Sequence, residues 1–340
     1  MIPGETIHMF GAVQSGILTE DPHVLVARLR ERRLQTLFVR EYFIPFRMMP
    51  DRMDQIHTLL RPLVQTPTNR DFHPVAYYFS AVLWSAQFRS TYASILESVV
   101  RVQFRKLLAG AFACSLVLIL LWVAISEKRA QRAAAWSVVA TGYTLMTLQI
   151  LLLLTFQAVY GYVYQELAAL TGMFMAGIAL GSWLGITRVR AGNGRSLLRA
   201  ATMNQLLVAT SAPLLLFLVI LVANASGSVS AMLAAKVAFP ALAMLCAIPG
   251  GFQFPMASRI YQQTYPAQAS ISALYASDLL GGCAGALVLA GFLIPVFGCW
   301  GTAWLTAAIS STPVIILFLA SRDSLAGSHG RVHALRIPRR

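Results

Sequence analysis

Asp278 is the residue of this sequence whose type and setting best suit chemistry. It lies six positions inside a long uncharged segment, which places it about 9 Å deep if that segment is a membrane-crossing helix. A carboxylate at such a depth is costly and by default indicates a binding site. A second reading is that Asp278 caps a helix that begins after an interfacial stretch at Tyr275–Ser277. The sequence leaves both readings open.

A second set of candidate residues lies between two prolines in the preceding uncharged segment. Pro249, Gly250, Gly251 and Pro255 fall within seven residues, a composition that predicts a break or kink in a helix. Broken helices expose backbone groups that can bind ligands. Gln253 lies in this stretch, and it would offer Asp278 a polar partner if the two segments pack as neighbours.

Small residues recur at helical spacing in two segments. Residues of this kind four positions apart let helix backbones approach closely, which predicts helix packing, with a moving contact in a transporter as the alternative. The glycines concerned are Gly177, Gly181 and Gly185 in one segment, and Gly281 and Gly285 in another. Asn204 and Gln205 are predicted to form hydrogen bonds between helices.

Other catalytic and metal-binding patterns are not indicated. Asp71 and His73 share an aromatic-rich loop, and nothing in their spacing distinguishes an acid/base pair from a solvated loop. No Gly-rich phosphate loop and no serine nucleophile elbow is present in the sequence. The four cysteines lack metal-ligand spacing and are predicted to be small packing residues. We therefore expect neither a metal nor a cofactor bound by this chain.

The elements that must position these residues are membrane-spanning helices. Hydrophobic residues make up 57% of the chain and charged residues only 12%. Runs of about 20 apolar residues suffice to cross a bilayer, and within lipid the backbone must pair internally as a helix. The sequence predicts a mainly α, polytopic bundle of about seven spans. These are Leu107–Ile125, Ala135–Tyr160, Leu167–Ile186, Thr202–Ala223, Ala231–Met256, Ser272–Val296 and Trp300–Ala320.

The first hundred residues form a separate, charged segment. Helices are predicted at His23–Arg33 and Asp51–Leu60, and strands at Thr6–Val13 and Thr36–Arg40. This small α/β segment is too short and strand-poor for a complete doubly wound domain, and it has the character of the end of one. The predicted organisation is therefore a soluble segment at 1–100, a membrane domain at 101–322 and a basic tail at 323–340.

The charge distribution predicts orientation and excludes one class of partner. The formal charge of +14 comes from basic residues beside apolar runs, as the positive-inside rule expects, and no basic and aromatic stripe suits nucleic acid. With seven spans the basic C-terminal tail lies in the cytoplasm and the N-terminal segment outside. One span more or fewer returns the N-terminal segment to the cytoplasm. The expected partner is the lipid bilayer, in a plasma membrane such as the bacterial inner membrane.

Two stretches resemble a known family. One covers residues 42–84, with FVREYFIPFRMMPDRM and TPTNRDFHPVAYYFSAVLW. The other covers the membrane part, with FQAVYGYVYQELAALTGMFMAGIALGS, GGFQFPMASRIY and LYASDLLGGCAGALVLAGFLIPVFG. Together they resemble the C-terminal portion of membrane-fused spermidine synthase-like proteins, from the tail of the Rossmann-like domain onward.

This resemblance implies a polyamine aminopropyltransferase-like protein that uses decarboxylated S-adenosylmethionine as co-substrate. The nucleotide loop and catalytic acidic residues of that family precede the matched tail, so no catalytic residue carries over to this chain. The first expectation is a membrane portion, not catalytic alone, that anchors or serves a separate catalytic domain. The alternative is a stand-alone transporter of a small cation, such as a polyamine, with its site at the broken fifth and sixth spans. A third reading is a structural subunit assembled through its glycine faces.

Overall fold

The computed structural model describes ten stretches of the chain. They are residues 18–33, 41–60, 69–70, 72–80, 103–124, 128–160, 164–192, 194–224, 229–263 and 267–334. The chain divides into two compact units, Met1–Pro67 and Thr68–Arg340. Within the described stretches there are helices and no strands, apart from an isolated bridge between Arg70 and His73. The two predicted strands at residues 6–13 and 36–40 lie outside the described residues.

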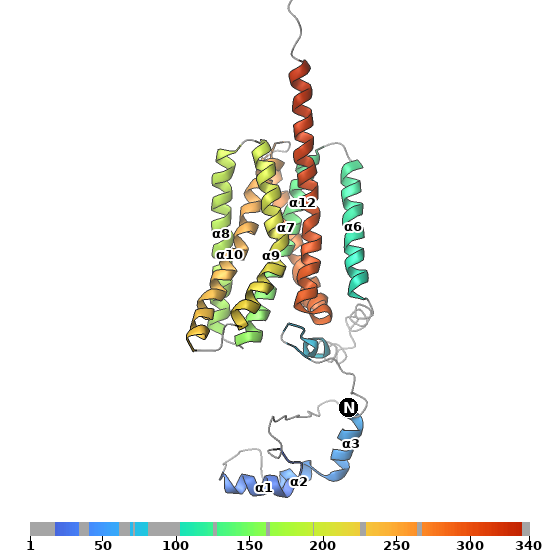
Figure 1. Cartoon of the computed structure of the whole chain (residues 1–340), viewed down its shortest axis with the longest axis vertical. Helices are drawn as coiled ribbons and strands as arrows, with labels where there is room; N and C mark the ends of the chain where they lie inside the picture. The colour runs from blue at the N-terminus through green and yellow to red at the C-terminus, as the bar shows by residue number, and fades with distance from the viewer. Residues whose placement is uncertain are drawn as a thin grey trace, which may run out of the picture. The chain divides into compact units, whose positions relative to one another are not determined.

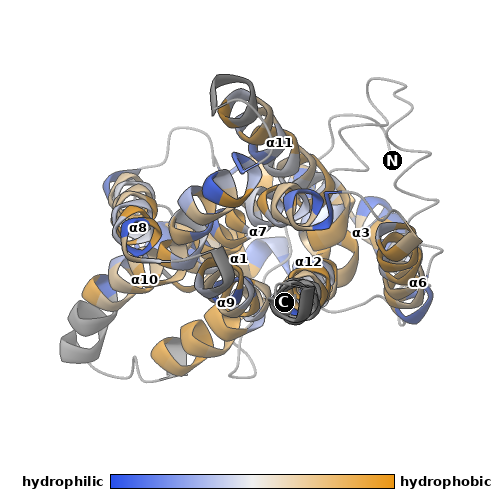
Figure 2. Ribbon diagram, turned by 90° about the horizontal axis from the view of Figure 1, so that it is seen from above, coloured by the Kyte–Doolittle hydropathy of each residue, from blue (hydrophilic) through white to orange (hydrophobic). Residues whose placement is uncertain are grey.

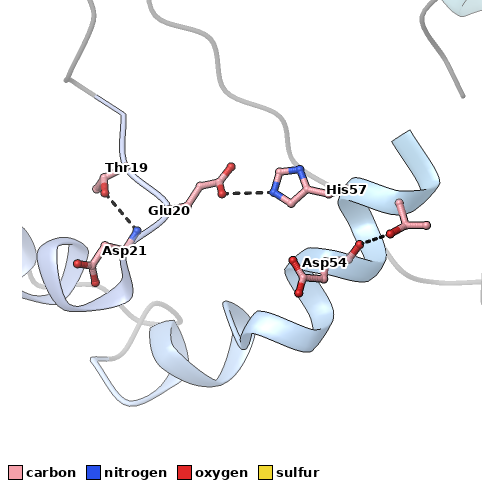
Figure 3. A network of polar contacts seen from close by, with 6 residues as sticks. Thr19, Glu20, Asp21, Asp54 and His57 are labelled. Atoms are coloured by element: carbon pink, nitrogen blue, oxygen red, sulfur yellow. Dashed lines mark hydrogen bonds and ion pairs between the residues drawn. The ribbon is translucent and has the colours of Figure 1, made fainter. Parts of the chain in front are cut away.

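The described part of the N-terminal unit contains three short helices, α1 (Pro22–Glu31), α2 (Phe43–Arg47) and α3 (Pro50–Leu60). Asp21 begins α1 as its N-cap, because its Oδ1 accepts the backbone N–H of His23 at 2.8 Å. Near the start of α1, the Glu20 carboxylate lies 3.3 Å from His57 Nε2 of α3 (Figure 3). Helix α3 begins at Pro50, one residue before the predicted start at Asp51, and proline is well suited to a first turn.

An exposed ion pair accompanies α1. Arg30 Nη2 lies 2.6 Å from Glu41 Oε2. The hydrogen bond from Arg30 holds the pKa of the Glu41 carboxyl below its ordinary value. Because both side chains are largely in solvent, such a pair adds little to stability.

The second unit is built from long apolar helices (Figure 1). Six helical stretches in its described part are long and apolar enough to cross a membrane, which is consistent with an integral membrane protein. They coincide with the predicted spans to within a few residues. The helices are α6 (Phe104–Ala124), α7 (Arg129–Tyr160), α8 (Tyr164–Ala191), α9 (Gly194–Asn224), α10 (Val229–Tyr261), α11 (Ala267–Val288), the π-helix η2 (Leu289–Leu293) and α12 (Ile294–Ala334).

The last of these stretches, Ile271–Arg322, consists of two helical segments joined at Gly298. Its 52 residues would extend about 78 Å as one helix, far beyond the roughly 30 Å hydrocarbon core. The chain reverses at Gly298, whose φ of 70° and ψ of −178° are not helical. After the reversal α12 runs parallel to α6, because the Phe104 ring lies beside Phe297 and Ser115 bonds to Thr312. With the last stretch divided at Gly298, the six candidate stretches correspond to the seven predicted spans.

Helix α7 occupies the centre of the bundle. It packs against α9, α10, α11 and α12, whereas α6 packs mainly on α12. Figure 2 shows α7 inside, with α8 and α10 to one side and α12 and α6 to the other. Accordingly, 61% of the most apolar stretch of α7 is buried, against 6% for α6. The apolar outer face of α6 suits lipid, which needs no protein partner to cover it.

Candidate functional site

Helices α7 and α11 approach each other closely through glycines. Gly281 lies against the backbone of Val139, and Gly285 lies against Tyr143, so the two helices run parallel. Gly142 faces the carbonyl oxygen and the carboxylate of Asp278. A Cβ at Gly142 would collide with both groups of Asp278. The glycine is therefore what lets the Asp278 side chain lie between the two helices.

The structure excludes the capping reading of Asp278. Helix α11 begins at Ala267 and continues beyond Asp278, so this residue lies in the helix interior. Its side chain is half-buried, and among the described residues none forms a hydrogen bond or ion pair with the carboxylate. By contrast, Glu166 near the start of α8 is paired with Lys236 of α10 at 2.8 Å. Asp278 is thus a carboxylate in a predicted span with no described counter-charge.

A second close helix pair is formed by α8 and α10. Gly177, Gly181 and Gly185 are buried, and they face the backbone of Met244, Ile248 and Phe252 in turn. On α10, Gly251 faces the carbonyl of Ile178. The contacting residues advance in the same direction along both helices, so α8 and α10 are parallel as well. The packing role predicted for the glycines of both segments agrees with these contacts, and Gly250 adds a contact with the side chain of Leu145 on α7.

The break expected in the fifth span is not observed. Helix α10 is continuous from Val229 to Tyr261, with Pro240, Pro249 and Pro255 inside it. A proline leaves the carbonyl four residues earlier without its helical donor. For Pro255 this carbonyl belongs to Gly251, and it accepts a hydrogen bond from Ser182 Oγ of α8 at 3.1 Å. Neighbouring helices can satisfy the freed backbone in this way, so the helix persists.

Gln253 belongs to a buried polar cluster rather than to Asp278. Its Oε1 accepts a hydrogen bond from Asn204 Nδ2 at 2.8 Å, and its Nε2 donates to Ser137 Oγ at 3.1 Å. Asn204 Nδ2 also donates to the Pro249 carbonyl at 2.8 Å. The expected partnership of Gln253 with Asp278 is wrong because α7 separates most of α10 from α11. The interhelical bonding predicted for Asn204 is confirmed.

A short segment that precedes the bundle in the sequence packs against the turn at Gly298. The Phe72 carbonyl accepts the backbone N–H of Cys299 at 3.0 Å, and Gly298 lies against the backbone of Phe72 and against His73. Tyr77 OH donates to the Ala290 carbonyl in η2 at 3.4 Å. The described residues between 69 and 77, here called the docking segment, therefore meet both the π-helix and the turn. Asp71, the other half of the considered acid/base pair, lies outside the described residues.

The comparisons with known proteins give no family for this chain. No protein-family model matches it, and neither a curated protein nor a solved structure shows significant similarity. The resemblance to spermidine synthase-like proteins therefore remains an expectation that rests on the quoted sequence stretches alone.

Proposed function

We propose that this chain is a membrane protein that binds a small organic cation at Asp278 and carries it across or along the membrane. The observation that supports this is the placement of the Asp278 carboxylate between α7 and α11, against Gly142, without a described counter-charge. Intramembrane carboxylates of this kind typically serve substrate, ion or proton pathways. A polyamine or a smaller alkylammonium ion has the complementary charge.

The surroundings of Asp278 favour one cationic group over an extended binding surface. Its neighbours Tyr275 and Leu279 are exposed on the outer side of α11. Gly142 lies in close contact with Asp278 and brings no competing charge. One carboxylate neutralises one ammonium group, and the rest of the ligand would meet apolar side chains. Selectivity for charge with tolerance for ligand size follows from this arrangement.

Replacement of Asp278 by asparagine is expected to abolish cation uptake. Asn keeps the size of the side chain and removes the charge that the ligand needs, so uptake of labelled spermidine and of methylammonium into proteoliposomes should fall at least about tenfold. Asp54→Asn, which removes a carboxylate from α3 in the N-terminal unit, is the control and should leave uptake unchanged. Uptake of both cations at the wild-type rate by the Asp278→Asn protein would refute the proposal.

A second candidate function is favoured by the docking segment. Its residues lie in the stretch that resembles the tail of a spermidine synthase-like domain, and they pack on η2 and the Gly298 turn. Such a contact would couple a preceding catalytic domain to the bundle. In this proposal the chain is the membrane portion of an aminopropyltransferase-like system and is not catalytic alone.

The two candidates differ in an activity assay. The second predicts no aminopropyl transfer from decarboxylated S-adenosylmethionine to putrescine by the chain purified after expression alone. It predicts transfer by the tagged chain isolated in mild detergent from its native membrane, together with its catalytic partner. Absence of transfer in the native preparation would discard the second candidate, and transfer by the isolated chain would discard its non-catalytic assignment.

A further inference from the structure

A layer of uncharged polar side chains crosses the bundle between α7, α9 and α10. Figure 2 shows α7 in the middle of the bundle, with α9 and α10 beside it. The side chains are almost completely buried, with exposures between 0% and 6%. They are Ser137, Thr141, Asn204, Gln205 and Gln253.

Most of the hydrogen-bonding groups in this layer have partners. Gln253 uses both ends of its amide, and Asn204 Nδ2 donates to two oxygens. Gln205 differs. Its Oε1 accepts a hydrogen bond from Thr141 Oγ1 at 3.2 Å, whereas its Nε2 has no acceptor among the described residues although the side chain is 0% exposed.

An amide nitrogen left without an acceptor in a membrane interior is unfavourable, because neither lipid nor the protein then satisfies its N–H group. Rotation of the Gln205 amide by a half turn does not remove the deficit. Nε2 would then donate to Thr141, and Oε1 would take the place of the unmatched group. In either orientation Gln205 keeps hydrogen-bonding capacity that the described protein atoms do not use.

We propose that Gln205 and Thr141 form one wall of an intramembrane site for a neutral hydrogen-bonding molecule, either water or a small polar solute such as glycerol or urea. The hydrogen-bond partners in the layer are hydroxyl, amide and carbonyl groups and include no ionised side chain. Burial of an ion there would lack a counter-charge. A molecule with an oxygen acceptor satisfies Nε2 without that penalty. This site is separate from Asp278, which lies at the α7–α11 contact.

Water-edited solid-state NMR on the full chain in lipid bilayers, with glutamine labelled at the side-chain ¹⁵N, tests the site directly. Gln253 is the internal control, because it is equally buried and both its Oε1 and its Nε2 have a hydrogen-bond partner. The two signals are assigned with Gln205→Asn and Gln253→Asn. We expect magnetisation transfer from water to Gln205 Nε2 that is several-fold stronger than transfer to Gln253.

The solutes distinguish the two occupants. Transfer that weakens when glycerol or urea is added identifies a site open to small neutral solutes, and transfer that persists identifies an ordered water. Transfer to Gln205 no stronger than transfer to Gln253 overturns the proposal. The decisive comparison uses the unaltered protein, and the two variants serve only to identify the Gln205 and Gln253 signals among the fifteen glutamines of the chain.

Discussion

Gly181→Leu is expected to separate α8 from α10 and to lower the stability of the bundle by about 3 kcal/mol. A Cβ at this position would collide with the carbonyl of Ile248 and the backbone of Phe252. Backbone atoms cannot rotate out of the way as the end of a side chain can. The two helices must therefore move apart, and the contacts along their length weaken together. Unfolding in a detergent titration, followed by circular dichroism, measures the loss.

Gly172→Leu is the matched control for this experiment. Gly172 lies on the same helix, is exposed, and has no atom within 4 Å of the position that a Cβ would take. Both substitutions replace glycine with the same helix-favouring residue, so their difference isolates the contact with α10. Equal stability of the two variants would show that the α8–α10 packing described above is incorrect.

Gly298→Ala is expected to destabilise the chain by about 3 kcal/mol and to release the docking segment. The φ of 70° with ψ of −178° is a conformation essentially restricted to glycine. An added Cβ would also press on the Phe72 carbonyl and on His73. Hydrogen exchange should therefore speed up at the Cys299 amide, which the Phe72 carbonyl protects.

Gly282→Ala provides the comparison for Gly298→Ala. At Gly282 a Cβ would make only ordinary contacts, at 3.4 Å to the Met146 side chain and 3.7 Å to the Gly142 carbonyl. We expect that variant to unfold like the wild type and to keep the Cys299 amide protected. Unchanged protection of Cys299 in Gly298→Ala would contradict the docking of Phe72 on the turn.

The membrane spans could be predicted because each depends on a local property, the absence of charge over about 20 residues. The reversal at Gly298 falls in the three residues between the predicted spans Ser272–Val296 and Trp300–Ala320. The spacing of Gly177, Gly181 and Gly185 also predicted a packing face. It did not identify α10 as the partner, because small residues at helical spacing allow close approach without specifying which helix approaches.

The site depends on which residues of different helices lie opposite one another, and the sequence indicates this only weakly. Gly142 is a single glycine in a long apolar run, and its role follows only from its position opposite Asp278. Ser137 and Thr141 are common residues in such helices. Only their four-residue spacing, which places them on one face of the helix, could have indicated a role in the polar layer. The break expected at Pro249–Pro255 does not occur. Ser182, which lies on another helix, donates to a carbonyl that has lost its backbone hydrogen bond.

The central structural claim is that the chain crosses the membrane seven times with a reversal at Gly298, and paired topology reporters test it most directly. Fusions of green fluorescent protein and alkaline phosphatase after Tyr160, after Ala191 and after Arg340 report the two faces of the membrane. We expect the Ala191 and Arg340 fusions to be fluorescent on the basic, cytoplasmic face and the Tyr160 fusion to have phosphatase activity. Phosphatase activity after Arg340, on the same face as Tyr160, would contradict the reversal and with it the seven-pass bundle.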